Sequence, residues 1–471
     1  MKKIVYPLLG LIIVAVLVAP NFIGQKAERE VKTLVEAVNA NPAYSVELKS
    51  YQRNWFTAEA VLQFAMEFPM PQEDGSQEIV TLNSGDVMLN IQHGPVLSQF
   101  VGGLGALSWR LSANDEALRD NLSWSDDSPL YELTGSMGLT GNATYQDAMA
   151  DFSYRAVAED VLVNVIGYSG AGNFNGQQFG YRGENKKLAL TMAGDLLVVD
   201  DIAFSTDAQG SFIDALNAKM MNTDMTLRVA EVRSGSVAVA DDKLDVAMQG
   251  LEVTADSKLS DDGATGNLNF NTRIATLGLP NGDAKELLLN IEINRLDVEF
   301  IQAYQKAMNA TYDQPTEVMQ EQVEALFSRY LEQVIAADPE FAITQMSGQL
   351  PDGDVNGELS LSMGEIESLP AGGVSAEFWL DHLLANGYIQ AAKPVVRNAL
   401  ALQLEMALSQ QMPNQDVNSE QFQSMIEQQV NQVVNVYLQQ GFMEEEGGNF
   451  ESAFELKEGT LSLNGKPIPL I

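Results

Sequence analysis

The chain has 471 residues, with 27 Lys and Arg against 64 Asp and Glu, so its formal net charge is -37. A field of that sign repels phosphate backbones, which excludes nucleic acid as an expected partner. Cysteine is absent, which excludes disulfides, thiol nucleophiles and thiolate metal sites, while 45% hydrophobic residues suffice for a folded core.

The first segment predicts a membrane helix. Residues 4–24 carry no charge, and the run 8–18 is almost continuously apolar. About 20 such residues in a helix cross a hydrocarbon core of about 30 Å, because lipid cannot pair backbone polar groups. Lys2 and Lys3 precede the run, which favours a cytoplasmic N-terminus.

A cleaved signal peptide is the alternative for the same segment. Cleavage requires small residues one and three positions before the cut. Ala19 satisfies the first requirement, but Leu17 is too large for the second and Pro20 would follow the cut. We therefore favour an uncleaved anchor. Either interpretation exports the bulk of the chain.

The next part of the chain predicts a short amphipathic helix and then a long antiparallel sheet. Residues 25–39 have apolar residues at helical spacing. From Tyr44 to about Asn294 the apolar period changes to two, in short segments separated by turn signals such as Asn175-Gly176. This pattern is typical of a meander with one buried face. A helical insert is expected near 114–121, and 211–221 is ambiguous.

The last third predicts several helices among strands. Helices are expected at 297–310, 316–337 and over most of 374–411, the last interrupted near Gly387 and Pro394. Strands are expected at 341–361, 450–456 and 460–463. The segment Glu444-Glu445-Glu446 is expected in a loop. A further helix is expected from an N-cap at Asn418 to Gly441. Its expected apolar face consists of Phe422, Ile426, Val430, Val433 and Tyr437.

These elements predict an α+β protein with a single transmembrane helix, a large antiparallel meander and amphipathic helices in the C-terminal third. The expected division is an anchor at 1–25, a β-rich region at 26–300, and a helical region with closing strands at 301–471. The last region is expected to pack on the same sheet as one domain.

Three separated motifs resemble the YdgA-type family of bacterial membrane-anchored envelope proteins, known as DUF945. They are Tyr51-Gln52-Arg53-Asn54-Trp55-Phe56-Thr57-Ala58-Glu59-Ala60, Ile91-Gln92-His93-Gly94-Pro95 and Gly459-Thr460-Leu461-Ser462-Leu463-Asn464-Gly465-Lys466-Pro467. Asn54 stands where the family usually has glycine, which suits a turn or a left-handed position. With the N-terminal anchor, the resemblance covers essentially the whole chain. It implies an envelope location and no established reaction. Together with the expected anchor, the expected location is the inner membrane, crossed once, with the bulk of the chain in the periplasm.

The motif residues are interpreted as structural: Tyr51, Arg53, Trp55, His93, Gly94, Pro95, Asn464 and Gly465. His93 has no catalytic partner nearby in sequence, so we expect a turn at Gly94-Pro95 with the imidazole bonded to backbone. Arg53 and Trp55 form a ligand platform in one interpretation and a structural pair in the favoured one. His382 is expected at a helix core or boundary.

No segment predicts a catalytic, cofactor or metal site. Asp352, Asp354 and Asn356 resemble the first half of a calcium loop, but position twelve is Met363 rather than glutamate. A hairpin turn is therefore favoured there over a calcium site. Nucleophile-elbow and dinucleotide-loop patterns fail at 167–176, and two histidines without cysteine disfavour zinc.

The expected function is non-enzymatic binding or scaffolding in the cell envelope. Expected partners are a membrane through the N-terminal helix, and an envelope protein, a lipid or a second copy of the chain. A lipid-binding or transport protein is one alternative. The other is a carboxylate-dependent envelope hydrolase, since a pair of acids among the 64 would not show in sequence.

Overall fold

The computed structural model describes residues 2–71, 77–100, 102–156, 161–217, 219–239, 244–279, 281–312, 314–366, 369–370, 374–411 and 419–468. It divides into two compact units. Unit 1 contains residues 1–246, 256–259 and 298–329; unit 2 contains 247–255, 260–297 and 330–471. The expected division at residues 25 and 300 stays a prediction about domains.

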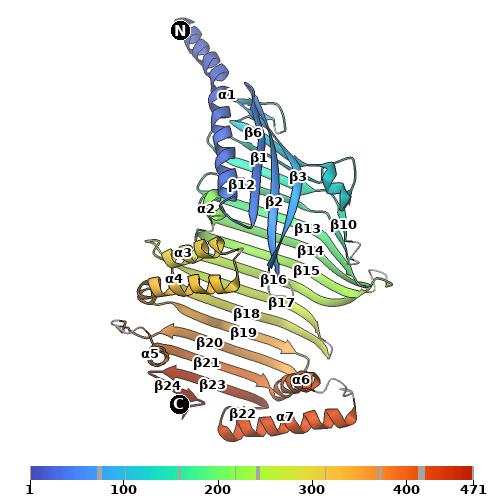
Figure 1. Cartoon of the computed structure of the whole chain (residues 1–471), viewed down its shortest axis with the longest axis vertical. Coiled ribbons are helices and arrows are strands. Elements are labelled where there is room, and N and C mark those ends of the chain that lie inside the picture. Colours follow the sequence, from blue (N-terminus) through green and yellow to red (C-terminus); the bar gives the residue numbers. More distant parts are fainter. Residues whose placement is uncertain are drawn as a thin grey trace. The chain divides into compact units, whose positions relative to one another are not determined.

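Unit 1 is an antiparallel sheet with helices (Figure 1). Its helical elements are α1 (Lys2–Val38), the 3-10 helix η1 (Glu116–Asp120), α2 (Phe212–Leu216) and α3 (Val298–Ala310). Its first strands are β1 (Tyr44–Arg53), β2 (Thr57–Pro71), β3 (Gln77–His93), β4 (Val96–Leu97), β5 (Gly103–Leu104), β6 (Leu107–Ala113), β7 (Leu122–Trp124) and β8 (Tyr131–Met137). The others are β9 (Ala143–Met149), β10 (Phe152–Ala156), β11 (Val161–Ile166), β12 (Ser169–Phe174), β13 (Gln178–Met192), β14 (Asp195–Gln209) and β15 (Asn222–Ser236).

Hairpin connections order this sheet. Hydrogen-bonded neighbours run β1-β2-β3-β6-β8-β9-β12-β13-β14-β15, all antiparallel. A branch β7-β10-β11 pairs with the second half of β13. Because Cα partners on neighbouring strands share a face, the register defines a helix-bearing face, which carries the core, and an opposite face.

The core of unit 1 lies between α1 and β1, β2, β3 and β6. Its buried residues are Val46, Ala58, Ala60, Leu62, Val87, Leu89, Ile91 and Ala113. Val31, Val35 and Val38 of α1 pack on this cluster at helical spacing. Asn39 then ends the helix, because its side chain accepts from the Val46 backbone N–H at 2.6 Å and donates to the Val46 carbonyl at 3.0 Å.

Unit 2 is a second antiparallel series. Its strands are β17 (Thr265–Leu279), β18 (Gly282–Asp297), β19 (Glu340–Leu350), β20 (Gly353–Met363), β21 (Leu383–Ala392), β22 (Glu444–Glu446), β23 (Asn449–Lys457), β24 (Thr460–Leu463) and β25 (Lys466–Ile468). They pair in the order β17-β18-β19-β20-β21-β23-β24-β25, with β22 on β23. Its helices are α5 (Ala376–His382), α6 (Lys393–Gln411) and α7 (Glu420–Gln440). Strand β16 (Asp245–Leu259) and helix α4 (Thr316–Ala336) contribute residues to both units.

The predicted α+β class with a large antiparallel meander is confirmed, and two local predictions are wrong. The interruption expected near Gly387 in the helical segment 374–411 is present, but it is a full strand, β21, which pairs with β20 and β23. Pro394 lies in the first turn of α6, where its missing N–H costs nothing. The segment 444–446 is a strand rather than a loop.

The apolar face of α7 is predicted nearly correctly. Phe422, Ile426 and Val430 are buried as expected, whereas Val434 is buried in place of Val433 and Tyr437 is exposed. The buried residues follow a strict four-residue spacing. The expected N-cap Asn418 lies outside the described residues, and Ser419 caps the helix by accepting from the Phe422 N–H at 3.3 Å. The expected end at Gly441 is confirmed.

The expected anchor and the amphipathic segment after it belong to one continuous helix, α1. Figure 1 shows the N-terminal turns of α1 extending beyond the ends of the strands. Within the residues whose side chains the structure describes, no helix has the length and apolar character needed to cross a membrane. The apolar run 8–18 lies outside those residues.

Candidate functional site

Helix α1 packs against the C-terminal end of β3 through small residues. Pro20, Gly24 and Ala27 are buried at helical spacing on the side facing the sheet. A Cβ atom added at Gly24 would lie 2.6 Å from Cε1 of His93 and 2.8 Å from its Nε2. Glycine is therefore required where the helix passes over the imidazole.

The His93 side chain is fully enclosed at this contact. It is 0% exposed, and neither ring nitrogen has a hydrogen-bond partner. The expected imidazole–backbone hydrogen bond is thus not formed in good geometry, although the carbonyls of Thr57 and Pro20 lie near enough to favour the protonated form. Burial is the larger effect and lowers the pKa of His93 below its usual 6.5.

Arg53 and Tyr51 bring β1 to the same helix. The Arg53 guanidinium donates to Asn21 Oδ1 at 2.8 Å and pairs with Glu28 at 3.4 Å, so it extends along two turns of α1. The Lys32 ammonium and then Arg53 lower the pKa of Glu28. The Tyr51 hydroxyl is buried without a hydrogen-bond partner, and burial, followed by the charge of Glu28, raises its pKa to about 12. We call Pro20, Asn21, Gly24, Glu28, Tyr51, Arg53, His93 and Gly94 the docking cluster.

The neighbouring motif residues form turns. Gly94 has φ 134°, and a Cβ there would lie 3.2 Å from Pro20 Cγ. Pro95 begins the β4–β5 hairpin, accepting at its carbonyl from Gly105 at 3.3 Å. Trp55 lies exposed in the β1–β2 turn, where the Asn54 N–H donates to the Thr57 carbonyl at 2.8 Å. The left-handed position allowed for Asn54 is not adopted, since Asn54 is not among the residues with positive φ.

The third motif lies in unit 2. Asn464 has φ 48° and Gly465 has φ 72° in the β24–β25 turn. Asn464 Oδ1 accepts from the Ala453 N–H at 2.7 Å, and its Nδ2 donates to the Gly441 carbonyl at 2.8 Å. This motif therefore joins the end of α7 to the sheet, and the first two motifs converge elsewhere, on α1.

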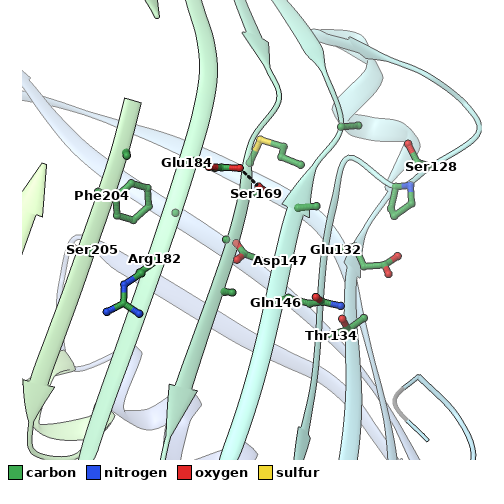
Figure 2. A pocket seen from close by; sticks show the side chains of 18 of the residues that line it. Ser128, Glu132, Thr134, Gln146, Asp147, Ser169, Arg182, Glu184, Phe204 and Ser205 are labelled. Atoms are coloured by element: carbon green, nitrogen blue, oxygen red, sulfur yellow. Dashed lines mark hydrogen bonds between the residues drawn. The ribbon is translucent and has the colours of Figure 1, made fainter. Parts of the chain in front are cut away.

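A hollow of about 880 Å³ lies over strands β8 to β15 on the face opposite α1. Its side chains are mostly polar: Glu132, Thr134, Gln146, Ser169, Arg182, Glu184, Ser205, Thr226 and Arg228. Figure 2 shows those from Glu132 to Ser205 spread along successive strands, with the Ser169 hydroxyl donating to Glu184 at 3.2 Å. Arg182 pairs with Asp207 at 3.2 Å, and Glu132 pairs with Arg110. The hollow is a paired polar surface.

Asp147 also lines this hollow, but its carboxylate lies on the helix-bearing face among three tyrosines. Oδ2 accepts from Tyr131 at 3.1 Å and from Tyr168 at 3.0 Å, and Oδ1 accepts from Tyr181 at 2.8 Å. Burial raises the pKa of all three phenols, so they remain donors. A Cβ at Gly170 would collide with Asp147 and with Tyr181.

This arrangement favours holding the sheet together over acid–base chemistry. Three phenols surround the carboxylate of Asp147, and the Tyr168 and Tyr181 hydroxyls also bond each other at 2.6 Å, which leaves little room for a substrate. Glu132 and Glu184, the other acids of the hollow, are already paired with Arg110 and Ser169.

The remaining sequence candidates lie apart from these clusters. His382 ends α5, stacks on Phe378 and contacts the Phe378 carbonyl through Nδ1 at 2.8 Å, as expected for a helix boundary. The predicted hairpin turn after Leu350 is present, and Asp352 accepts from Asn398 at 2.6 Å while Asp354 and Asn356 lie within β20. Across the ranges that the structure describes, no group of three or more acidic or histidine side chains can hold a metal ion.

Sequence reasoning missed Gly24 and the Asp147 cluster. One signal for the latter exists: Asp147 shares the alternation of Ala143, Tyr145 and Met149, so it is an acid on the side of the strand that faces the core. An acid there needs donors, because an unpaired buried carboxylate is strongly destabilising. Its tyrosine partners could not be predicted from the sequence around Asp147, because they lie on other segments of the chain.

Comparison with known proteins adds three findings. A family model described as "Bacterial protein of unknown function (DUF945)" matches residues 1–471. The chain is similar to "Protein YdgA" of Escherichia coli (strain K12), with 20% identity over 384 residues that cover 72% of this chain and 70% of the relative. No solved structure matches the chain.

Proposed function

This chain belongs to the DUF945 family of bacterial proteins of unknown function, and from that premise we propose that it is an inner-membrane protein of the cell envelope which acts by binding or scaffolding. The N-terminal part of α1 anchors it in the bilayer. The sheet units lie in the periplasm and present surfaces to partners.

The docking cluster is the observation that carries this proposal. Two motifs of the family resemblance lie 40 residues apart in sequence, yet Arg53 bonds Asn21 while His93 and Gly94 enclose Gly24 and Pro20. These contacts begin where the apolar run of α1 ends. Residues that hold a helix at a defined angle to a sheet are expected where a membrane anchor must orient a domain.

The charge pattern supports the direction of insertion. Lys2 and Lys3 precede the apolar run, so the positive-inside rule keeps the N-terminus in the cytoplasm. The net charge of -37 belongs mainly to the part beyond the anchor, and it keeps that part soluble.

Binding is favoured over hydrolysis by the saturated carboxylates. A retaining or inverting hydrolase needs two acids facing a substrate, whereas Asp147 is enclosed by Tyr131, Tyr168 and Tyr181.

Lipid is the second candidate ligand, because Phe204, Met225 and Leu227 are exposed large apolar side chains on the helix-bearing face. Native mass spectrometry of the full chain, released from membranes, distinguishes a lipid carrier from a protein scaffold. Stoichiometric lipid supports a carrier, and a protein partner or a second copy supports a scaffold. Preparations that repeatedly carry none of these contradict a binding role.

The absence of cysteine permits a direct topology experiment. Met192→Cys places a thiol at an exposed strand end of unit 1, and Lys3→Cys places one before the apolar run. In intact spheroplasts, a membrane-impermeant maleimide is expected to label only Met192→Cys, and permeabilisation is expected to expose Lys3→Cys. Carbonate washing is expected to leave both variants in the membrane fraction. Release by carbonate, or labelling of both sites in intact spheroplasts, contradicts the anchor.

A further inference from the structure

Three connections of unit 1 lie together at the end where α1 continues toward its N-terminus. They are the β1–β2 turn (54–56), the β3–β6 connection containing the β4–β5 hairpin (94–106), and the β8–β9 turn (138–142). The Phe56 carbonyl accepts from His93 at 2.8 Å, and the Met137 carbonyl accepts from Ala106 at 2.8 Å. The docking cluster joins this end to Pro20 of α1.

None of these three connections contains a charged residue, although charged residues make up 19% of the chain. The same holds for residues 20–25 of α1, where the helix leaves the sheet. In a protein with a net charge of -37, exposed connections are expected to carry charged residues, because these keep the surface soluble. Solubility therefore does not explain the uncharged surface at this end.

These connections instead expose large apolar side chains. The exposed residues are Phe22, Trp55, Phe56, Val96, Phe100, Leu104 and Leu139, with exposed fractions from 40% for Phe100 to 79% for Leu104. We call them the apical ring. The β3–β6 connection, which carries Val96, Phe100 and Leu104, is held in place by hydrogen bonds to the sheet. The buried Gln92 side chain accepts from the Ser98 and Gln99 N–H groups at 2.9 and 2.7 Å, and Ser108 donates to the Gln99 carbonyl at 3.1 Å.

We propose that the apical ring is a second membrane contact, which rests on the bilayer interface around the point where α1 enters it. This inference rests on the proposed anchoring. The continuity with α1 selects lipid over other occupants, since the apolar run 8–18 precedes Pro20 directly. Aromatic and aliphatic side chains partition into the boundary between headgroups and acyl chains. Without basic residues, the contact depends on apolar insertion and does not require anionic lipid.

A nitroxide spin label in the full-length protein tests whether the apical ring contacts the bilayer. Leu104→Cys carries the nitroxide in the apical ring, and Leu139→Cys carries it in a second loop. Leu82→Cys is the matched control, because Leu82 is also an exposed leucine but lies 11 residues from His93 along β3, about 35 Å away. The labelled proteins are placed in nanodiscs of phosphatidylcholine, and collision with O₂ is compared with collision with a water-soluble nickel chelate.

Lipid contact predicts strong O₂ collision and loss of nickel collision at 104 and 139, with the reverse at 82, independent of salt. Nickel collision at 104 and 139 equal to that at 82 overturns the proposal. Loss of both collisions indicates a second copy of the chain on this surface and overturns it as well. Carbonate resistance of the same proteins is scored separately. A protein that resists carbonate but has water-exposed labels retains its anchor and lacks this contact.

Discussion

His93 is an imidazole enclosed between a helix and a sheet, with Arg53, Glu28 and Tyr51 as the nearby titratable groups. Burial lowers its pKa, and the charge of Arg53 acts in the same direction. The unfolded chain therefore takes up a proton more readily than the folded one. Protonation in the folded state would place a cation in the packed contact with Gly24, and the nearby carbonyls of Thr57 and Pro20 offset the cost of burying it only in part.

We expect the free energy of unfolding to fall as the pH drops below the ordinary histidine pKa of about 6.5. His93 contributes no penalty above that value, and the loss grows until the pH reaches the lowered folded pKa. The His93→Gln variant cannot take up this proton, so the stability difference between wild type and variant is expected to shrink from pH 7 to pH 5. Denaturant melts at each pH measure it. Parallel curves, or the same change in His382→Gln, would refute the assignment to His93.

The Asp147 cluster makes a second prediction at the scale of single residues. Asp147→Asn replaces one acceptor oxygen by a donor facing tyrosine donors, so a buried group loses its partner. We expect the free energy of unfolding to fall by about 2–3 kcal/mol. Tyr168→Phe removes one of three donors and is expected to cost about 1 kcal/mol. Denaturant unfolding followed by tyrosine absorbance measures both, and an Asp147→Asn protein as stable as wild type would contradict the structural role.

Between elements, the contact of α1 with β3 is decided by a missing side chain. Alanine is normally about 1 kcal/mol better than glycine inside a helix. At Gly24 its Cβ would overlap the imidazole, which costs about 1–3 kcal/mol as overpacking.

We therefore expect Gly24→Ala to lower the free energy of unfolding, against its helix propensity. In a His93→Ala background the obstruction is gone, and the same substitution is expected to be neutral or to stabilise by about 1 kcal/mol. The double-mutant cycle isolates this coupling. Additive effects of the two substitutions would show that Gly24 and His93 do not meet.

Element prediction succeeded where the apolar period was sustained and failed where short elements adjoin. The buried face of α7 follows a four-residue spacing that its sequence carries alone. Strand β21 lies between α5 and α6, where the sequence predicted an interruption of the helix near Gly387 but not a strand of ten residues. Pairing with β20 and β23 outweighs that local preference, because backbone groups in a sheet are satisfied by distant strands.

At the scale of the whole molecule, the proposed membrane anchor is tested by placing a charge in its apolar run. Leu11→Arg places a charge in the middle of the apolar run and is expected to cost about 3 kcal/mol of insertion free energy. Less protein is then expected in the carbonate-resistant membrane fraction, while Leu11→Ala is expected to behave as wild type. Equal retention of both variants would argue against a spanning helix.

The amino-acid sequence by itself determined the α+β class, the antiparallel meander, the helical start and the family resemblance. Each of these depends on a short-range sequence pattern: a period of two, a period near 3.6, an uncharged run or a short motif. Only the tertiary structure decided that Gly24 faces His93, that Tyr131, Tyr168 and Tyr181 surround Asp147, and that three uncharged connections meet beside α1. Such contacts depend on strand register and on the packing of a helix across several strands. No local pattern encodes them, since each joins residues that only the folded sheet brings within reach.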